Sequence, residues 1–212
     1  MTDDLIAELS TDLRPVPATR LRSWLLYATA AGAILAFVVM VLSIGLRSDY
    51  PGAFADPIFW AKFLYTLAFL GFGLWSAERL SRPGGNMRAP VLGAVALVAL
   101  TAVAGIVQLV TASPEQLSGL IIGHTALVCP FYILALSVPL FVAITLVMRR
   151  LAPTNLTLAG FASGLAAGAA SCWVYAFHCG ENGLPFITLW YTAGILVVAL
   201  IGAAMGRYLL RW

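Results

Sequence analysis

A short polar stretch, from Tyr175 to Pro185, separates two long apolar runs and holds the side chains best suited to chemistry. His178, Cys179 and Glu181 lie within four positions, in a chain with only two histidines, three cysteines and nine acidic residues. Thiolate and imidazole groups bind soft metal ions, and thiols can also be oxidised. The stretch is therefore a candidate sensing or binding site.

The composition indicates which class of protein must position this stretch. Hydrophobic residues make up 61% of the 212 residues and charged residues 10%, with a mean hydropathy of +0.95. Globular proteins carry about 25% charged residues, so the composition predicts an integral membrane protein without a large soluble domain. The net charge of +3 is small and sits in loops, which argues against direct binding of nucleic acid.

Six apolar runs are long enough to cross a hydrocarbon layer of about 30 Å as helices. They cover residues 23–46, 58–77, 90–110, 125–148, 156–176 and 186–209. The predicted fold is an all-α integral membrane protein with six transmembrane helices. Within the fifth helix, Gly160, Gly164 and Gly168 recur every fourth residue among alanines, which favours close helix packing inside the protein.

The distribution of basic residues predicts the orientation of these helices. Ten of the twelve fall on one side when the ends of the runs are assigned to alternate sides, and only Arg47 and Lys62 fall on the other. By the positive-inside rule, both termini are cytoplasmic. Residues 48–57, 111–123 and 177–185 then face outward, and we expect the protein to lie in a bacterial inner membrane.

This topology places the cysteines relative to one another. Counting about 1.5 Å per residue outward from the end of the fourth run, Cys129 lies near the outer edge of the bilayer. Cys179 lies just past the outer end of the fifth run, in the same layer. His124 and His178 adjoin this layer, and Cys172 lies about two turns below Cys179.

The spacing leaves three interpretations of these residues open. Cys129 and Cys179 can form a disulfide in an oxidising compartment, or bind Cu(I) or another thiophilic ion with histidine help. They can also be packed apolar thiols. Cys172 is either a third ligand of such a site or a packed thiol, and its position in the small-residue row favours the packed thiol. We expect Pro130 and Pro139 to kink the fourth helix, the first of them beside Cys129.

The N-terminal segment is the other distinctive part of the chain. We divide the sequence into a cytoplasmic segment, residues 1–22, and a transmembrane domain, residues 23–212. Within the first, apolar side chains repeat at helical spacing and acids flank them, which predicts a short amphipathic helix that docks on a partner. The residues proposed for this contact are Leu5, Ile6, Glu8, Leu9, Asp12 and Leu13.

No enzyme motif is present: the sequence has no HExxH, GxSxG, Walker A or CxxC pattern. We therefore expect no catalytic activity and no obligatory cofactor. A transport or metal-handling protein that uses the same cysteines is the alternative, although its mid-membrane segments would usually contain ionisable residues.

Several short motifs resemble a known family. Residues 5–16, residues 59–62, residues 149–153, and Cys179 followed by Trp190 and Tyr191 together resemble the NrsF family of membrane anti-sigma factors. The resemblance implies an extracytoplasmic-function sigma factor as partner, held inactive at the membrane. It also implies that Cys129 and Cys179 match the two family cysteines, which are implicated in sensing metal or oxidative stress. Cys172 has no counterpart.

Overall fold

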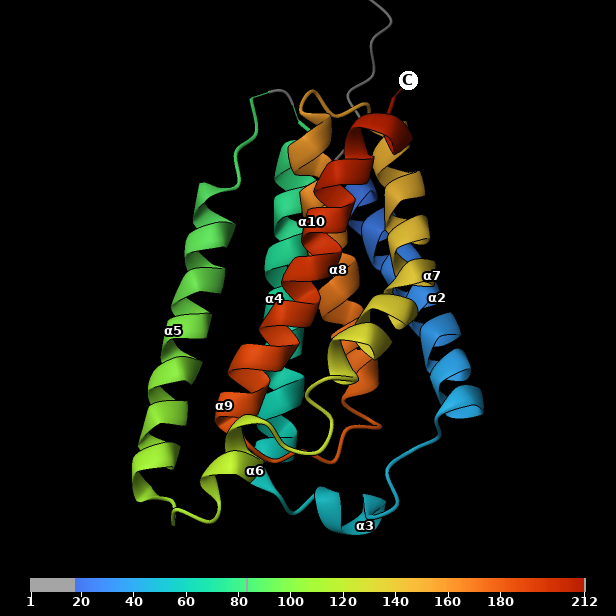
Figure 1. Ribbon diagram of the computed structural model, residues 1–212. Coiled ribbons are helices and arrows are strands. Elements are labelled where there is room, and N and C mark those ends of the chain that lie inside the picture. The colour runs from blue at the N-terminus through green and yellow to red at the C-terminus, as the bar shows by residue number, and fades with distance from the viewer. Residues whose placement is uncertain (1–17, 83, 212) are drawn as a thin grey trace, which may run out of the picture.

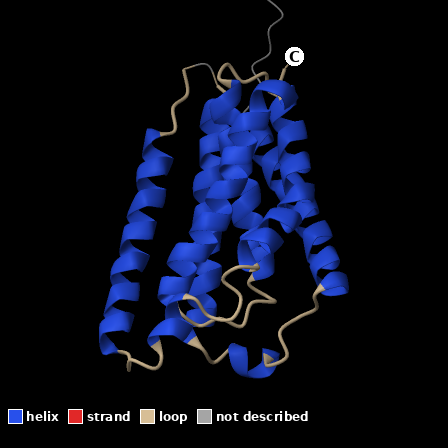
Figure 2. Ribbon diagram, in the orientation of Figure 1, coloured by secondary structure: helices blue, strands red, loops and turns tan. Residues whose placement is uncertain are grey.

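The computed structural model describes residues 18–82 and 84–211, and all regular structure in this part of the chain is helical (Figures 1 and 2). The predicted N-terminal helix lies outside the described residues, so its docking role and the division at residue 22 remain predictions. The long helices are α2 (Ala18–Ser43), α4 (Pro57–Leu80), α5 (Arg88–Thr111), α7 (Cys129–Arg150), α8 (Leu156–Tyr175) and α10 (Thr192–Leu209). The short ones are α3 (Tyr50–Ala53), α6 (Leu117–Ile121), α9 (Leu184–Phe186) and the π-helical turn η1 (Ile187–Tyr191).

Six helical segments among the described residues are long and apolar enough to cross a membrane, as predicted, the last being the continuous segment Leu184–Leu209. The start of α2, the C-terminus and the α4–α5 and α7–α8 connections lie at one end of the bundle (Figure 1). The other connections, including the polar stretch after α8, lie at the opposite end. The alternation expected from the sequence is therefore present, while the cytoplasmic assignment of the termini stays a prediction.

Side-chain caps fix the residues at which α4 and α8 begin. Asp56 accepts a hydrogen bond from the Ile58 amide (2.8 Å) and Pro57 opens α4. Asn155 accepts one from the Leu158 amide (3.0 Å) at the start of α8. These side chains satisfy amide donors that the first helical turn leaves unpaired.

The predicted kink at Pro130 is wrong. The fourth helix begins at Cys129 rather than in the run from residue 125, so Pro130 lies in its first turn, and only Pro139 is inside it. Amide groups in the first turn of a helix have no acceptor within the helix, so a proline there costs no helical hydrogen bond. Pro130 therefore opens α7 and fixes the position of Cys129 as its first residue.

α8 is the central helix of the bundle. Fifteen of its 20 residues are buried, and α10, α4, α7 and α2 all pack on it. Its glycines face the backbone of α10: a Cβ added at Gly164 would lie 2.5 Å from the Val198 carbonyl oxygen and 2.8 Å from the Ala199 Cα. The predicted internal packing of the small-residue row is confirmed. α5, in contrast, buries only Pro90 and Gly105 and stands at the edge of the bundle (Figure 1).

We predict that Gly164→Ala destabilises the protein by about 1–3 kcal/mol, because the added methyl meets backbone that cannot move without separating α8 from α10. The matched control is Gly71→Ala in α4, where an added Cβ meets nothing within 4 Å and removing glycine from a helix stabilises it by roughly 0.5–1 kcal/mol. Thermal unfolding of both variants in detergent measures the difference. Equal midpoints would contradict the close contact.

Candidate sensing site

The structure places the three cysteines at the end of the bundle opposite the start of α2. Cys129 is the first residue of α7, Cys172 lies in the last turn of α8, and Cys179 follows that helix. All three are free thiols and at most 1% exposed. Cys179 lies within electrostatic range of Cys129, and Cys172 lies within range of both.

Two tyrosines that the sequence analysis did not select lie against these thiols. Tyr175 ends α8 and Tyr191 ends η1, and both side chains are fully buried. The Tyr175 hydroxyl neighbours Cys129 and the Tyr191 hydroxyl neighbours Cys179. Neither hydroxyl has a hydrogen bond of normal geometry to any described residue.

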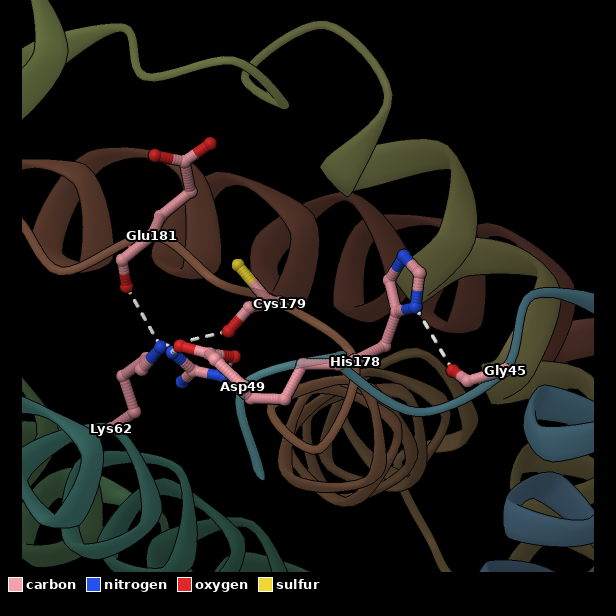
Figure 3. A network of polar contacts seen from close by, with 7 residues as sticks. Gly45, Asp49, Lys62, His178, Cys179 and Glu181 are labelled. Carbon is pink, nitrogen blue, oxygen red and sulfur yellow. Dashed lines mark hydrogen bonds and ion pairs between the residues drawn. The ribbon is translucent and has the colours of Figure 1, made fainter. Parts of the chain in front are cut away.

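The histidines are directed elsewhere. The His178 ring turns toward α2, where its Nδ1 lies 3.0 Å from the Gly45 carbonyl oxygen (Figure 3). His124 is exposed. Among residues 18–82 and 84–211, no three His, Cys, Asp or Glu side chains are grouped closely enough to hold a metal ion. The described residues therefore offer two thiols within electrostatic range of each other, Cys129 and Cys179, rather than a mixed set of ligands.

A buried lysine holds the polar stretch in place. Lys62, in α4, is 0% exposed, and its Nζ donates hydrogen bonds to the backbone oxygens of Cys179 (2.9 Å) and Glu181 (2.7 Å) (Figure 3). In the part of the chain that the structure describes, it forms no ion pair within 4 Å. The sequence alone contains a clue to this role, because the only lysine of the chain falls inside an apolar run, where ionisable side chains are rare.

Glu181 connects the same stretch to the start of α7. Its carboxylate points away from Lys62 (Figure 3) and accepts hydrogen bonds from the His124 amide (2.7 Å) and the Thr125 hydroxyl (3.1 Å). The Thr125 carbonyl in turn accepts from the Cys129 amide (2.8 Å). A continuous series of hydrogen bonds therefore joins α4, the loop that carries Cys179 and the residue that carries the second thiol.

The loop after α2 closes the remaining side of the site. The Arg47 amide donates to the Phe177 carbonyl (3.3 Å), and its guanidinium forms two hydrogen bonds of 2.7 Å with Asp49. This bidentate contact raises the pKa of Arg47 and lowers the pKa of Asp49. Arg47 is only 7% exposed, so the exposed Asp49 carboxylate keeps an otherwise buried cation paired.

We predict that Lys62→Met loosens the loop of residues 177–185, because two buried carbonyls lose a charged donor. Loss of such hydrogen bonds corresponds to roughly tenfold or more in a local opening equilibrium. Hydrogen exchange of the loop amides should rise accordingly, while exchange in the α8–α10 contact stays unchanged. Glu115→Gln, which alters an exposed acid at the same end of the bundle, is the control, and unchanged loop exchange in Lys62→Met would contradict the role given to Lys62.

Comparison with known proteins places this arrangement in a family. The family model described as "Negative regulator of sigma F" (NrsF) matches residues 9–212. A probable anti-sigma-F factor NrsF from Azospira oryzae is 38% identical over 218 aligned residues, which cover 100% of this chain and 99% of the relative. The anti-sigma-F factor NrsF of Caulobacter vibrioides matches with the same identity and coverage. No solved structure matches.

The match covers the site as well as the helices that position it, and it agrees with the resemblance found in the sequence motifs. This chain belongs to the NrsF family, the negative regulators of sigma F.

Proposed function

We propose that this protein is a membrane-embedded anti-sigma factor that binds an extracytoplasmic-function sigma factor and releases it when Cys129 and Cys179 react with a thiophilic metal ion or an oxidant. Family membership over nearly the whole chain supports the anti-sigma activity. The observation that carries the sensing part is that the free thiols of Cys129 and Cys179 lie at the same end of the bundle, within electrostatic range of each other. The proposed location is the bacterial inner membrane.

The donor set restricts the chemistry of the stimulus. Two thiolates without a third grouped ligand suit a soft ion such as Cu(I), whereas Zn²⁺ prefers four ligands. When bound, such an ion would link α7 to the loop after α8 through Cys129 and Cys179. Alternatively, the two thiols can lose two electrons and two protons to an external oxidant and form a disulfide between the same residues. Both inputs replace two separate thiols by one cross-link.

The hydrogen bonds around the thiols connect such a change to the rest of the bundle. A cross-link that moves Cys179 also moves the two carbonyl oxygens that accept hydrogen bonds from Lys62. Because Lys62 belongs to α4, the displacement is passed to that helix. At its other end, α4 carries Glu78, which is bonded to Arg22 of α2 (2.8 Å) and to Arg82 (3.0 Å). α2 directly follows the segment proposed to bind the sigma factor. The stimulus acts in this proposal by binding one arrangement of these helices more tightly than the other.

We expect the N-terminal segment to bind through its apolar stripe. Leu9→Asp combined with Leu13→Asp should weaken sigma-factor binding roughly thirtyfold or more, as loss of a buried apolar anchor does. The matched control is Ala7→Asp with Thr11→Asp, which adds the same charge on the opposite face of the expected helix. Binding is measured by pull-down with the partner sigma factor in detergent. Intact binding of the Leu9 and Leu13 variant would exclude this contact.

The sensing role predicts a stimulus-dependent loss of affinity. Cu(I), or an oxidant in a separate arm, should weaken sigma-factor binding to the unmodified protein by about 5–150-fold, the usual range of allosteric coupling. Cys129→Ser combined with Cys179→Ser should bind the sigma factor and lose this response. Cys172→Ser serves as the control and should retain it.

A flux assay and a transcription assay distinguish the second candidate function. A transport or metal-handling protein that uses Cys129 and Cys179 would show stimulus-dependent flux in vesicles and would not need residues 2–16. An anti-sigma factor shows no flux, and deletion of residues 2–16 activates transcription without a stimulus.

A further inference from the structure

A groove runs along the outside of the bundle between α7 and α10, away from the thiols. Its volume is about 360 Å³, and its lining is mostly apolar, with Phe141 and Leu146 on one side and Ile201 and Met205 on the other. This volume lies within the range of about 300–1,000 Å³ that ligand pockets occupy in proteins. Three polar side chains of α7 interrupt the apolar lining. The Ser137 hydroxyl already donates to the Leu134 carbonyl (2.7 Å), which leaves two polar groups to account for.

The first is Arg149, in the last turn of α7, at the end of the bundle where α2 begins and α10 ends. It is exposed and forms no ion pair with any residue of 18–82 or 84–211. Glu78 is the only described acid at this end, and it is already bonded to Arg22 and Arg82. The cation at the rim of the groove therefore lacks an anion from the described chain.

The second is Thr145, one helical turn deeper. It is 8% exposed, and its hydroxyl has no hydrogen-bond partner among the residues that the structure describes. Thr66 and Thr101, in comparison, bond the carbonyl four residues earlier in their own helices, at 2.9 and 3.0 Å. A buried hydroxyl without a partner is unfavourable, so Thr145 lacks a partner that the groove can supply.

The spacing of these groups fits one class of ligand. Four helical residues separate Thr145 from Arg149, a rise of about 6 Å, which suits a phosphate and the ester oxygens below it. From Thr145 to Leu134, at the far end of the lining, eleven residues span about 16 Å. This length matches the acyl layer of one leaflet, half of a hydrocarbon core of about 30 Å.

We propose that the groove between α7 and α10 is a binding site for one anionic glycerophospholipid. The phosphate pairs with Arg149, an ester oxygen accepts a hydrogen bond from the Thr145 hydroxyl, and one acyl chain lies along the groove as far as Leu134. The site rests on the proposed membrane setting but not on the sensing chemistry. A helix from a second copy fits less well, because the described chain offers no free acid at this end to pair with Arg149.

The test is native mass spectrometry of the purified full chain in a neutral detergent, titrated with phosphatidylglycerol. One bound lipid per chain is expected, with diacylglycerol and inorganic phosphate each binding far more weakly. Arg149→Gln and Thr145→Val should each lower phosphatidylglycerol affinity, the first by roughly tenfold, the factor for losing one hydrogen bond to a charged group. The matched controls are Arg150→Gln, beside the groove, and Thr101→Val in α5, and both should bind as the unmodified protein does.

Equal binding of phosphatidylglycerol and diacylglycerol, or equal losses in Arg149→Gln and Arg150→Gln, would overturn the site. A dimer that Arg149→Gln and Thr145→Val disrupt, with no lipid bound, would assign the groove to a second copy instead. A protein that is not embedded in a membrane would give a different result, because it would remain monodisperse in buffer without detergent.

Discussion

The close approach of α8 to α10 is the contact on which the rest of the bundle depends. Glycines on both helices let the two backbones meet, and an added Cβ at Gly164 would contact carbonyl and Cα atoms directly. In a bilayer, helices gain little from burying apolar side chains, so van der Waals contact between close backbones stabilises their association. α8 thereby becomes the helix on which α2, α4, α7 and α10 pack, and its last turn carries Cys172 and Tyr175 into the site.

The site itself depends on Lys62, which acts on backbone oxygens rather than on a carboxylate. Its Nζ donates hydrogen bonds to two carbonyls of the loop after α8. The Glu181 carboxylate accepts a hydrogen bond from the His124 amide in the turn before α7. The thiols of Cys129 and Cys179 thus belong to segments whose positions are set by the same few hydrogen bonds. In the proposed sensing role, a stimulus that joins the two sulfur atoms would act on that small set of hydrogen bonds and, through Lys62, on α4.

Much of this architecture could be predicted from the sequence. Six apolar runs, the small-residue row of α8 and the placement of Cys129 and Cys179 at the same end of the bundle depend on helical rise and composition, which are local properties. The start of α7 was misjudged because an apolar run extends to residue 125, whereas the chain from Thr125 to Val128 forms a turn. The partners of Lys62 and the burial of Tyr191 depend on helix rotation and loop backbone, which the sequence pattern does not determine. The direction of the His178 ring and the exposure of His124 also depend on helix rotation and loop backbone.

In the proposed membrane setting, the difference between α5 and α8 has a consequence for how the helices would be inserted. α5 is strongly apolar and almost entirely unburied, whereas α8 is among the least apolar of the six candidate spans and the most buried. A translocon can therefore release α5 into lipid on its own affinity, while α8 is the span that gains most from protein neighbours. Because α10 supplies the closest of these neighbours and follows α8 in the chain, the central helix of the bundle reaches its final environment only after α10 has been synthesised.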